Sequence, residues 1–163
     1  ASHYETLWCP EYAREYLLKH GRKYNYDDLL TIAKGQIALE EEFIGKINVK
    51  SCLTPHASRL LFIDTDMYVM KVWSEFVFGK CHRFILEQIA GRQYDLYLLC
   101  NVDLPWIKDE LREYPDLKTR QQLYFIYKDI MINQPVQWVD IRGSYEERLQ
   151  KAIEVIELTF RNY

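Results

Sequence analysis

The sequence has little glycine, and none of it is arranged to bind phosphate. The chain has 163 residues, of which 6 are glycine. They stand at Gly21, Gly35, Gly45, Gly79, Gly91 and Gly143. None of them fits the spacing GxxxxGK(S/T) or GxGxxG, the motifs whose backbone N–H groups cradle phosphates. The 163 residues therefore contain no Gly-rich phosphate-binding loop.

Metal-binding motifs, excess positive charge and long apolar runs are lacking too. The cysteines Cys9, Cys52, Cys81 and Cys100 form no CxxC pair and fit no zinc spacing, so we expect buried, reduced thiols. A net charge of −3 gives no general attraction to nucleic acid or anionic lipid. No apolar run is long enough to span a bilayer, and the N-terminus does not resemble a signal peptide. These absences predict a cytoplasmic protein that binds neither nucleic acid nor membrane.

The composition is sufficient for a single packed core. Hydrophobic residues make up 48% of the chain and charged residues 28%, which is typical of a globular protein. No repeat, low-complexity segment or long linker is visible. The length suits one domain over residues 1–163.

Short apolar runs alternate with stretches of helical spacing. We expect strands at residues 6–9, 59–63, 94–100 and 136–141. We expect helices at residues 10–20, 28–45, 66–78, 83–90, 119–132 and from 145, and a polar loop at 48–58. Ser144, followed three residues later by Glu147, predicts a capping box at the last helix. Strands separated by helices of this length predict an α/β fold, a parallel sheet with helices on both faces.

Two carboxylates follow the apolar run at residues 60–63. Asp64 and Asp66 therefore come at the C-terminal end of a strand that reads as buried on both faces, where open α/β sheets bind ligands. A carboxylate at that position can hold the water shell of Mg²⁺, and Asp64 is the candidate for this role. The alternative is that both acids only cap the following helix.

Glu11 and Arg14 follow the first strand and project from the same edge of the expected sheet. They are three residues apart, so they share one face of a helix. The carboxylate can accept a hydrogen bond from a substrate hydroxyl, and the guanidinium can bind phosphate with two N–H groups. The alternative is an exposed ion pair of little energetic value.

Two arginines, Arg112 and Arg120, lie in the region after the strand that ends at Cys100. Arginines in such a position can close over transferring phosphates and stabilise the charge that develops there. A solvated charged turn is the alternative interpretation.

The remaining candidates are aromatic side chains and the loop after the last strand. Tyr68, Trp73 and Trp106 can stack on a flat ring, although aromatic residues on helices more often belong to the core. Arg142 and Ser144 lie where a loop can wrap a purine base, but the same residues also suit an ordinary helix start.

Several of these segments together resemble a known family. Residues 10–16 (PEYAREY), 30–36 (LTIAKGQ) and 62–66 (FIDTD), with 106–112 and 145–148, are similar in order to the ribosylnicotinamide kinase domain of NadR-type proteins. The resemblance covers essentially the whole chain, and the first three segments in combination carry most of its specificity.

The resemblance implies a three-layer P-loop kinase of the nucleoside-kinase type. Such a domain transfers the γ-phosphate of ATP, with Mg²⁺, to the 5′-hydroxyl of nicotinamide riboside and forms nicotinamide mononucleotide. It implies that Asp64 faces the phosphates and metal, that residues 11–14 lie by the acceptor nucleoside, and that residues 112–120 form the lid. NadR-type proteins can also carry a nucleotidyltransferase domain upstream.

The chain departs from this family at its beginning. The family opens with a strand, GxxxxGK(S/T) and a helix, and residues 3–6 resemble the end of that helix. We therefore expect the first strand and the phosphate loop to be missing, about 30 residues, and the chain alone to be inactive. The alternatives are a P-loop ATPase with another acceptor and a nucleotide-sensing regulatory module without turnover. A GxxxxGK(S/T) motif ahead of Ala1 favours either enzyme.

Overall fold

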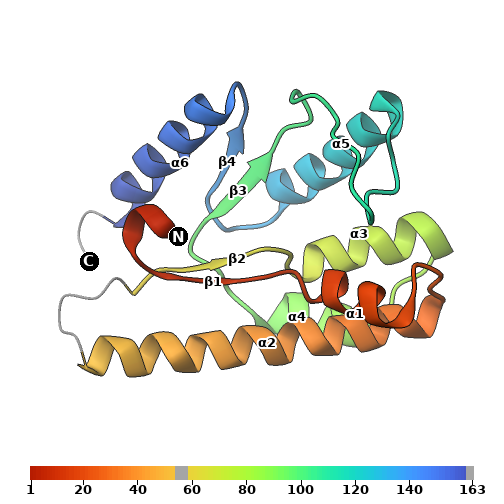
Figure 1. Cartoon of the computed structure of the whole chain (residues 1–163), viewed down its shortest axis with the longest axis horizontal. Coiled ribbons are helices and arrows are strands. Elements are labelled where there is room, and N and C mark those ends of the chain that lie inside the picture. Colours follow the sequence, from red (N-terminus) through yellow and green to blue (C-terminus); the bar gives the residue numbers. More distant parts are fainter. Residues whose placement is uncertain (54–58, 161–163) are drawn as a thin grey trace. The chain divides into compact units, whose positions relative to one another are not determined.

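The computed structural model describes residues 1–53 and 59–160, and the chain divides into two compact units (Figure 1). The first unit is Ala1–Ala90 and the second is Gly91–Tyr163. Each unit contains one pair of parallel strands together with helices. The expected α/β class with parallel strands is confirmed. The single domain expected over residues 1–163 stays a prediction, and each unit is described by itself.

The first unit is built around a two-stranded parallel sheet. Its elements are η1 (Ser2–Tyr4), β1 (Leu7–Cys9), α1 (Tyr12–His20), α2 (Tyr26–Leu53), β2 (Leu61–Ile63), α3 (Met67–Phe78) and α4 (Arg83–Gly91). β1 pairs with β2 from Leu7 opposite Leu61 to Cys9 opposite Ile63. Because α1 and α2 form the crossover between these strands, the pair is a βαβ unit, and both strands end at the same edge.

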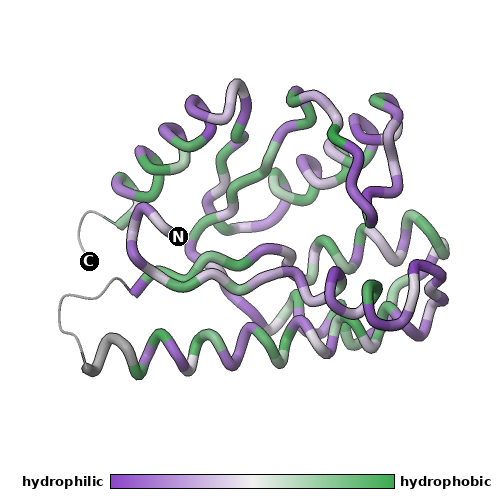
Figure 2. Tube along the Cα trace, viewed as in Figure 1, coloured by the Kyte–Doolittle hydropathy of each residue, from purple (hydrophilic) through white to green (hydrophobic). Residues whose placement is uncertain are grey.

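The long helix α2 contacts both strands and supplies much of the core of the first unit (Figure 1). Its buried positions recur at helical spacing, which is the period that predicted the helix. They include Leu29, Ile32, Ala33, Gln36, Ile37 and Glu40. Figure 2 shows hydrophobic turns alternating with hydrophilic ones along this helix. Two of the six positions are polar, and one of them has a role in the site described below.

The end of α2 was wrongly predicted. The sequence favoured an end near Gly45 and a loop over 48–58, whereas α2 continues to Leu53. Residues such as Asn48 and Ser51 lower helix propensity by well under about 1 kcal/mol each, too little to end a helix that is already formed. The helix ends two residues before Pro55, consistent with the restriction that proline places on the residue before it. Residues 54–58 lie outside the described part of the chain.

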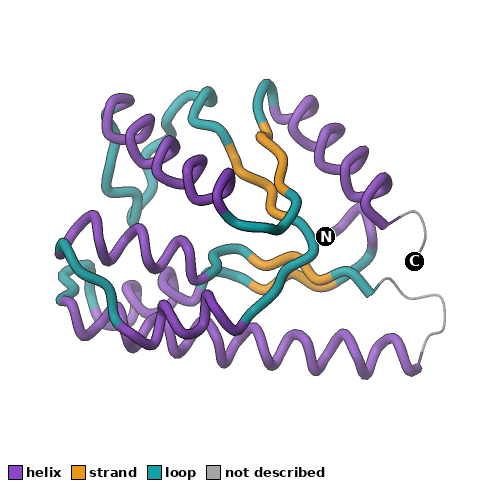
Figure 3. The backbone as a smooth tube through the Cα atoms, turned by 180° about the vertical axis from the view of Figure 1, so that it is seen from behind, coloured by secondary structure: helices purple, strands orange, loops and turns teal. Residues whose placement is uncertain are grey.

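The second unit contains the other parallel pair. Its elements are β3 (Tyr97–Cys100), α5 (Leu117–Asn133), β4 (Trp138–Ile141) and α6 (Tyr145–Phe160). β3 and β4 pair from Tyr97 opposite Trp138 to Cys100 opposite Ile141, while α5 packs on β3 and α6 on β4. A long loop connects β3 to α5 and is seen from behind in Figure 3. Both strands begin later than expected and end where expected.

Within the described residues, no helix combines the length and apolar character that crossing a membrane requires. Cys9, Cys81 and Cys100 are free thiols, and Cys9 is buried as expected. Cys100 is exposed, so the expectation of burial was wrong for that residue. The side chain of Cys52 lies outside the described part of the structure.

Candidate functional site

The first unit brings Glu11 and Asp64 to one edge of its sheet. Asp64 follows β2 directly, and its N–H donates to the carbonyl of Cys9 at 2.9 Å, which extends the parallel ladder by one step. Glu11 lies two residues beyond Cys9 on the neighbouring strand. The expectation that these residues share the C-terminal edge of parallel strands is therefore confirmed for this pair.

The turn that carries the two aspartates is strained. Thr65, between Asp64 and Asp66, has a φ of 78°, in the left-handed region. This conformation is rare for a β-branched residue, whose side chain crowds its own backbone there. Such backbone outliers persist only where surrounding structure imposes them, and they cluster at ligand-binding sites. The strain therefore supports a functional role for this turn.

The two aspartates have different environments. Asp66 is the N-cap of α3 and accepts the N–H of Val69 at 3.1 Å, so the capping interpretation applies to it. Asp64 makes no such cap. It is exposed to solvent on one side, yet desolvation by the protein around it raises its pKa. A nearby cation would favour its charged form.

The chemistry of this edge fits a magnesium ion that arrives with a nucleotide. Among residues 1–53 and 59–160, no three His, Cys, Asp or Glu side chains form a metal-binding cluster. Mg²⁺ keeps several waters and is commonly held by one or two carboxylates together with substrate phosphates. Asp64 suits that kind of site and not a metal cage made only of protein.

The turn from β1 into α1 is held by a side chain that was not among the site candidates from the sequence. Gln36 of α2 is fully buried. Its Oε1 accepts the N–H of Tyr12 at 2.7 Å, and its Nε2 donates to the carbonyl of Pro10 at 3.4 Å. Glu11 occupies the N-cap of α1 but makes no side-chain capping bond. A polar residue within an apolar helical stripe was the signal that could have identified this role.

The aromatic candidates in the first unit are packed to different degrees. Trp73 donates its indole N–H to the hydroxyl of Tyr24 at 2.8 Å, and the two rings lie edge to face with centroids 4.9 Å apart. Trp73 also packs against the core, so the core interpretation is favoured for it. Tyr68 is half-buried in the first turn of α3, and burial raises the pKa of its hydroxyl. Arg14 lies exposed on α1.

In the second unit, Arg148 binds residues of both loops that follow β3 and β4. Its Nη2 donates to the carbonyl of Asn101 at 2.9 Å and pairs with the carboxylate of Asp103. Its Nε donates to the carbonyl of Gly143 at 3.0 Å, and the N–H of Gly143 donates to Asp103 at 2.7 Å. The Gly143 N–H, and after it the positive charge of Arg148, lower the pKa of Asp103.

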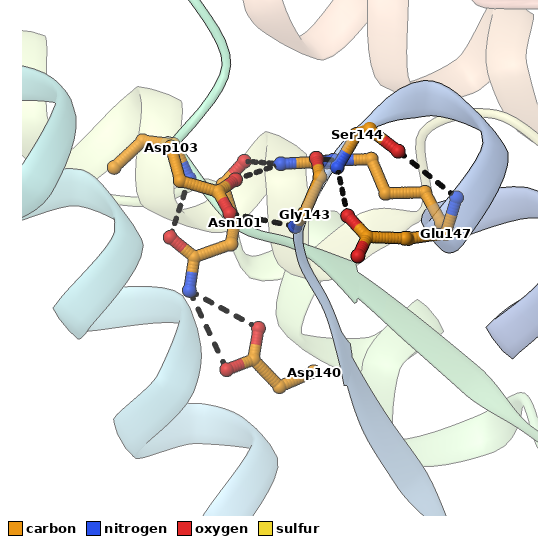
Figure 4. Close-up of polar contacts among 8 residues, drawn as sticks. Asn101, Asp103, Asp140, Gly143, Ser144 and Glu147 are labelled. Atoms are coloured by element: carbon orange, nitrogen blue, oxygen red, sulfur yellow. Dashed lines mark hydrogen bonds and ion pairs between the residues drawn. The ribbon is translucent and has the colours of Figure 1, made fainter.

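Beneath this arrangement lies a second polar group. The amide of Asn101 donates to both carboxylate oxygens of Asp140 at 3.2 and 3.4 Å (Figure 4). Burial, and after it the neighbouring Asp140, raise the pKa of Tyr124. Within the described structure, the Tyr124 hydroxyl and Nε of Arg120 are buried and have no hydrogen-bond partner. These residues are four apart on α5, so they share a face that has unused polar atoms.

The other sequence candidates of this unit lie on loops, as expected. Arg112 is exposed in the segment before α5 and donates to the carbonyl of Ile107 at 2.9 Å. Arg142 is exposed directly after β4. Ser144 and Glu147 form the predicted capping box, with the Ser144 N–H donating to Glu147 at 2.7 Å and the return bond at 3.3 Å (Figure 4). The Ser144 side chain therefore acts as an ordinary helix cap.

Known proteins resemble this chain over nearly its whole length. A family model described as an AAA domain matches residues 1–148. The trifunctional NAD biosynthesis/regulator protein NadR of Salmonella typhimurium (strain LT2) is 24% identical over 162 residues. NadR of Escherichia coli (strain K12) is 24% identical over 161 residues. Each alignment covers 96% of this chain and 37% of the relative, so the chain spans little more than a third of these proteins.

Two solved structures share the fold. NadR in complex with NR superimposes with a TM-score of 0.69 at 19% identity. NadR in complex with NAD and AMP-PNP gives a TM-score of 0.65 at 20% identity. Each covers 94% of this chain and 42% of the solved one. The resemblance inferred from the motifs is confirmed, and so is the P-loop kinase type of fold.

Proposed function

We propose that this chain, which belongs to the AAA domain family, acts in ATP-dependent phosphorylation of nicotinamide riboside to nicotinamide mononucleotide. The observation that carries the proposal is the edge of the β1–β2 sheet, where Glu11 and Asp64 follow paired parallel strands and Asp64 leads into a strained turn at Thr65. Support comes from the NadR structures, one of which holds NR and another NAD and AMP-PNP. The substrate remains a proposal because the chain spans only part of those proteins.

The first unit is proposed to bind the acceptor nucleoside and the metal. The proposed acceptor-binding residues are Glu11, Arg14, Asp66, Tyr68 and Trp73. Glu11 is assigned to a hydroxyl of the riboside, because a carboxylate accepts hydrogen bonds from hydroxyl groups. Asp64 holds Mg²⁺ through water. When bound, the ion neutralises charge that develops on the transferring phosphoryl group.

The second unit is proposed to act on the nucleotide. Arg112 and Arg120 are assigned to the phosphates, and the buried Nε of Arg120, which has no hydrogen-bond partner in the described structure, supports a polar ligand for that side chain. Arg142 and the loop ending at Ser144 are assigned to the base. Because the Ser144 hydroxyl caps α6, its proposed contact with the nucleotide is through the backbone.

The proposal separates acceptor binding from ATP binding. The 163 residues contain no GxxxxGK(S/T) loop, which in P-loop enzymes supplies most phosphate contacts. We expect isothermal titration calorimetry of this chain to detect nicotinamide riboside but no tight binding of Mg-ATP, and we expect no turnover. Tight Mg-ATP binding would contradict the inactivity of these residues alone. No binding of the riboside would contradict the acceptor.

Phosphoryl transfer itself is tested in a protein in which a GxxxxGK(S/T) segment precedes these residues. Labelled ATP is offered with a set of nucleosides, and phosphorylation of nicotinamide riboside is the expected result. Transfer to another nucleoside but not to this one would assign a different acceptor.

A nucleotide-sensing module without turnover is the second candidate, and a protein with no GxxxxGK(S/T) motif ahead of Ala1 would favour it. It predicts nucleoside binding with no labelled product in either form of the protein. An ATPase with another acceptor predicts release of phosphate that nicotinamide riboside does not accelerate.

A further inference from the structure

We propose that Gln36 is a positioning residue, which fixes the β1–α1 turn around Glu11 and thereby sets the affinity for the acceptor nucleoside. The second part of this inference rests on the proposed function. The first part concerns only the geometry of the turn and can be tested independently of any ligand.

The side-chain amide of Gln36 brackets Glu11 on both sides. Its Oε1 accepts the N–H of Tyr12 at 2.7 Å, the residue after Glu11. Its Nε2 donates to the carbonyl of Pro10 at 3.4 Å, the residue before it, and lies 3.8 Å from the Cys9 sulfur. One amide from α2 therefore holds the chain at the end of β1 and again at the start of α1, which leaves Glu11 little freedom to move.

The bond to Tyr12 also serves the start of α1. The first four N–H groups of an α-helix lack intrahelical partners. Tyr12 is the first residue of α1, and its N–H finds an acceptor in Gln36. The glutamine therefore fixes the first turn of α1 from a neighbouring helix.

Burial indicates that the amide serves the turn and not the core. Gln36 is 0% exposed and lies in the apolar stripe of α2 next to Ile37. A buried amide is costly unless it is hydrogen-bonded, and a leucine of similar size would pack there without that cost. The preceding residue, Gly35, has a matching role, since a Cβ there would overlap the ring of Tyr12. Of these neighbouring positions of α2, Gly35 leaves room for the Tyr12 ring and Gln36 binds the backbone of the same turn.

The first test compares Gln36→Leu with a matched control. Calorimetry should show that Gln36→Leu binds nicotinamide riboside about 10-fold more weakly or worse, as when a partner that orients a binding group is removed. The control is Ser74→Ala, which removes the hydrogen bond of another fully buried side chain of the same unit, from the Ser74 hydroxyl to the Lys80 carbonyl at 2.8 Å. It should lower stability and leave the affinity unchanged. Equal losses in both variants would reduce Gln36 to a general stabilising residue and overturn the proposal.

The second test uses the isosteric change Gln36→Glu and its pH dependence. A protonated carboxyl can donate to the Pro10 carbonyl and accept from Tyr12, as the amide does, whereas the ionised form has no proton to donate. The affinity of Gln36→Glu for nicotinamide riboside, divided by that of the unaltered chain, should therefore be close to one at low pH. This ratio should fall as the pH rises. A constant ratio across the pH range would contradict the role of the donated bond.

The surroundings of the introduced carboxyl set where this transition falls. The titratable groups around the turn are the Cys9 thiol, Glu11, Glu40, Glu42 and Asp64. Burial, followed by the carboxylates of Glu40, Asp64 and Glu42, raises the pKa of Cys9 to about 11. The same surroundings disfavour a new negative charge beside it, so the transition should occur above the ordinary range for glutamate.

A double-mutant cycle tests whether Gln36 acts through Glu11. In a Glu11→Gln background, Gln36→Leu should weaken binding by less than it does in the unaltered chain, because the carboxylate being positioned is gone. Fully additive losses would show that Gln36 affects the nucleoside by another route and would overturn this assignment.

The role of Gln36 in fixing the turn can be tested separately from the binding of nicotinamide riboside. If the unaltered chain does not bind nicotinamide riboside, the proposed function fails. Measurements on the backbone N–H of Tyr12 then test whether Gln36 positions the turn. Its NMR signal should shift, and its hydrogen exchange should accelerate, in Gln36→Leu but not in Ser74→Ala. An unchanged Tyr12 amide in Gln36→Leu overturns the proposal, whether or not the riboside binds.

Discussion

Asp64 and Asp66 are two residues apart in the sequence but have different physical roles. Asp66 uses its carboxylate on the N–H of Val69, whereas Asp64 makes no cap and has a pKa raised by desolvation. The sequence placed both acids after a buried strand, and that part was predictable. Their division of roles was not, because it depends on the left-handed conformation of Thr65, which turns the chain between them.

We predict that Asp64→Asn leaves the fold intact and abolishes phosphoryl transfer. The two side chains are nearly isosteric, but an amide cannot supply the negative charge that holds hydrated Mg²⁺. In a protein that also contains the phosphate loop, turnover with labelled ATP should fall by orders of magnitude, while the circular dichroism spectrum stays the same. Retained turnover would reduce Asp64 to a structural residue.

The same substitution should make the chain more stable at neutral pH. Burial raises the pKa of Asp64 in the folded state above the usual value of 3.8, so ionisation opposes folding. The free energy of unfolding therefore falls as the pH rises from below 3.8 through the higher folded pKa. Asp64→Asn should remove this fall in the free energy of unfolding. Urea unfolding of both proteins from pH 3 to pH 7 measures the difference, and an equal pH dependence would contradict the assigned pKa shift.

Two glycines of α2 give a matched pair of substitutions. A Cβ at Gly35 would overlap the Tyr12 ring, whereas a Cβ at Gly45 meets nothing within 4 Å. Gly45→Ala should stabilise the chain by about 0.5–1 kcal/mol through helix propensity. Gly35→Ala has the same gain, but overpacking costs about 1–3 kcal/mol, so we expect net destabilisation. Denaturant midpoints measure both changes, and stabilisation by Gly35→Ala would show that Tyr12 can move aside without cost.

At the scale of elements, the sequence predicted the kinds of structure better than their ends. The apolar period of α2 and the capping box at Ser144 were both sufficient signals. The end of α2 was missed, because residues 48–53 are polar but not strong enough helix breakers. The role of Gln36 was also hidden, since a helical period places a residue on a face without identifying its partners on another element.

The contacts of α6 with the loops after β3 and β4 should stabilise the chain less at acid pH. The Gly143 N–H and Arg148 lower the pKa of Asp103 below the usual value of 3.8. This carboxylate therefore contributes stability above 3.8, and the contribution is lost as the pH falls through the lower folded pKa. Asp103→Asn should remove this part of the acid dependence, measured by urea unfolding between pH 2 and pH 5.

The pair is partly exposed, with Asp103 at 39% and Arg148 at 11%, so the effect at neutral pH should be small. A double-mutant cycle with Arg148→Met should give a coupling of about 1 kcal/mol or less, typical of solvent-screened ion pairs. No coupling at all would mean that Arg148 contributes only through its bonds to the carbonyls of Asn101 and Gly143.

At the scale of the whole molecule, the sequence predicted parallel strands but not how they divide. In the part of the chain that the structure describes, β1 pairs with β2 and β3 with β4, and each pair lies within one compact unit. Apolar runs identify strands buried on both faces, and helical crossovers imply parallel pairing. The choice of neighbours depends on contacts between distant residues, which the period of a single strand does not encode.

This division predicts that the two units respond separately to local destabilisation. Each unit carries tryptophans that can report its unfolding, and Trp73 in the first and Trp138 in the second are half-buried. In chains that retain only one of them, with phenylalanine at the other tryptophans, Gly35→Ala should shift the unfolding of Trp73, and Ser144→Ala that of Trp138. The second shift should be about 1 kcal/mol, the usual loss for a serine cap. Coincident shifts of both probes in both variants would instead mean that residues 1–163 unfold as one cooperative domain, as the length of the chain first suggested.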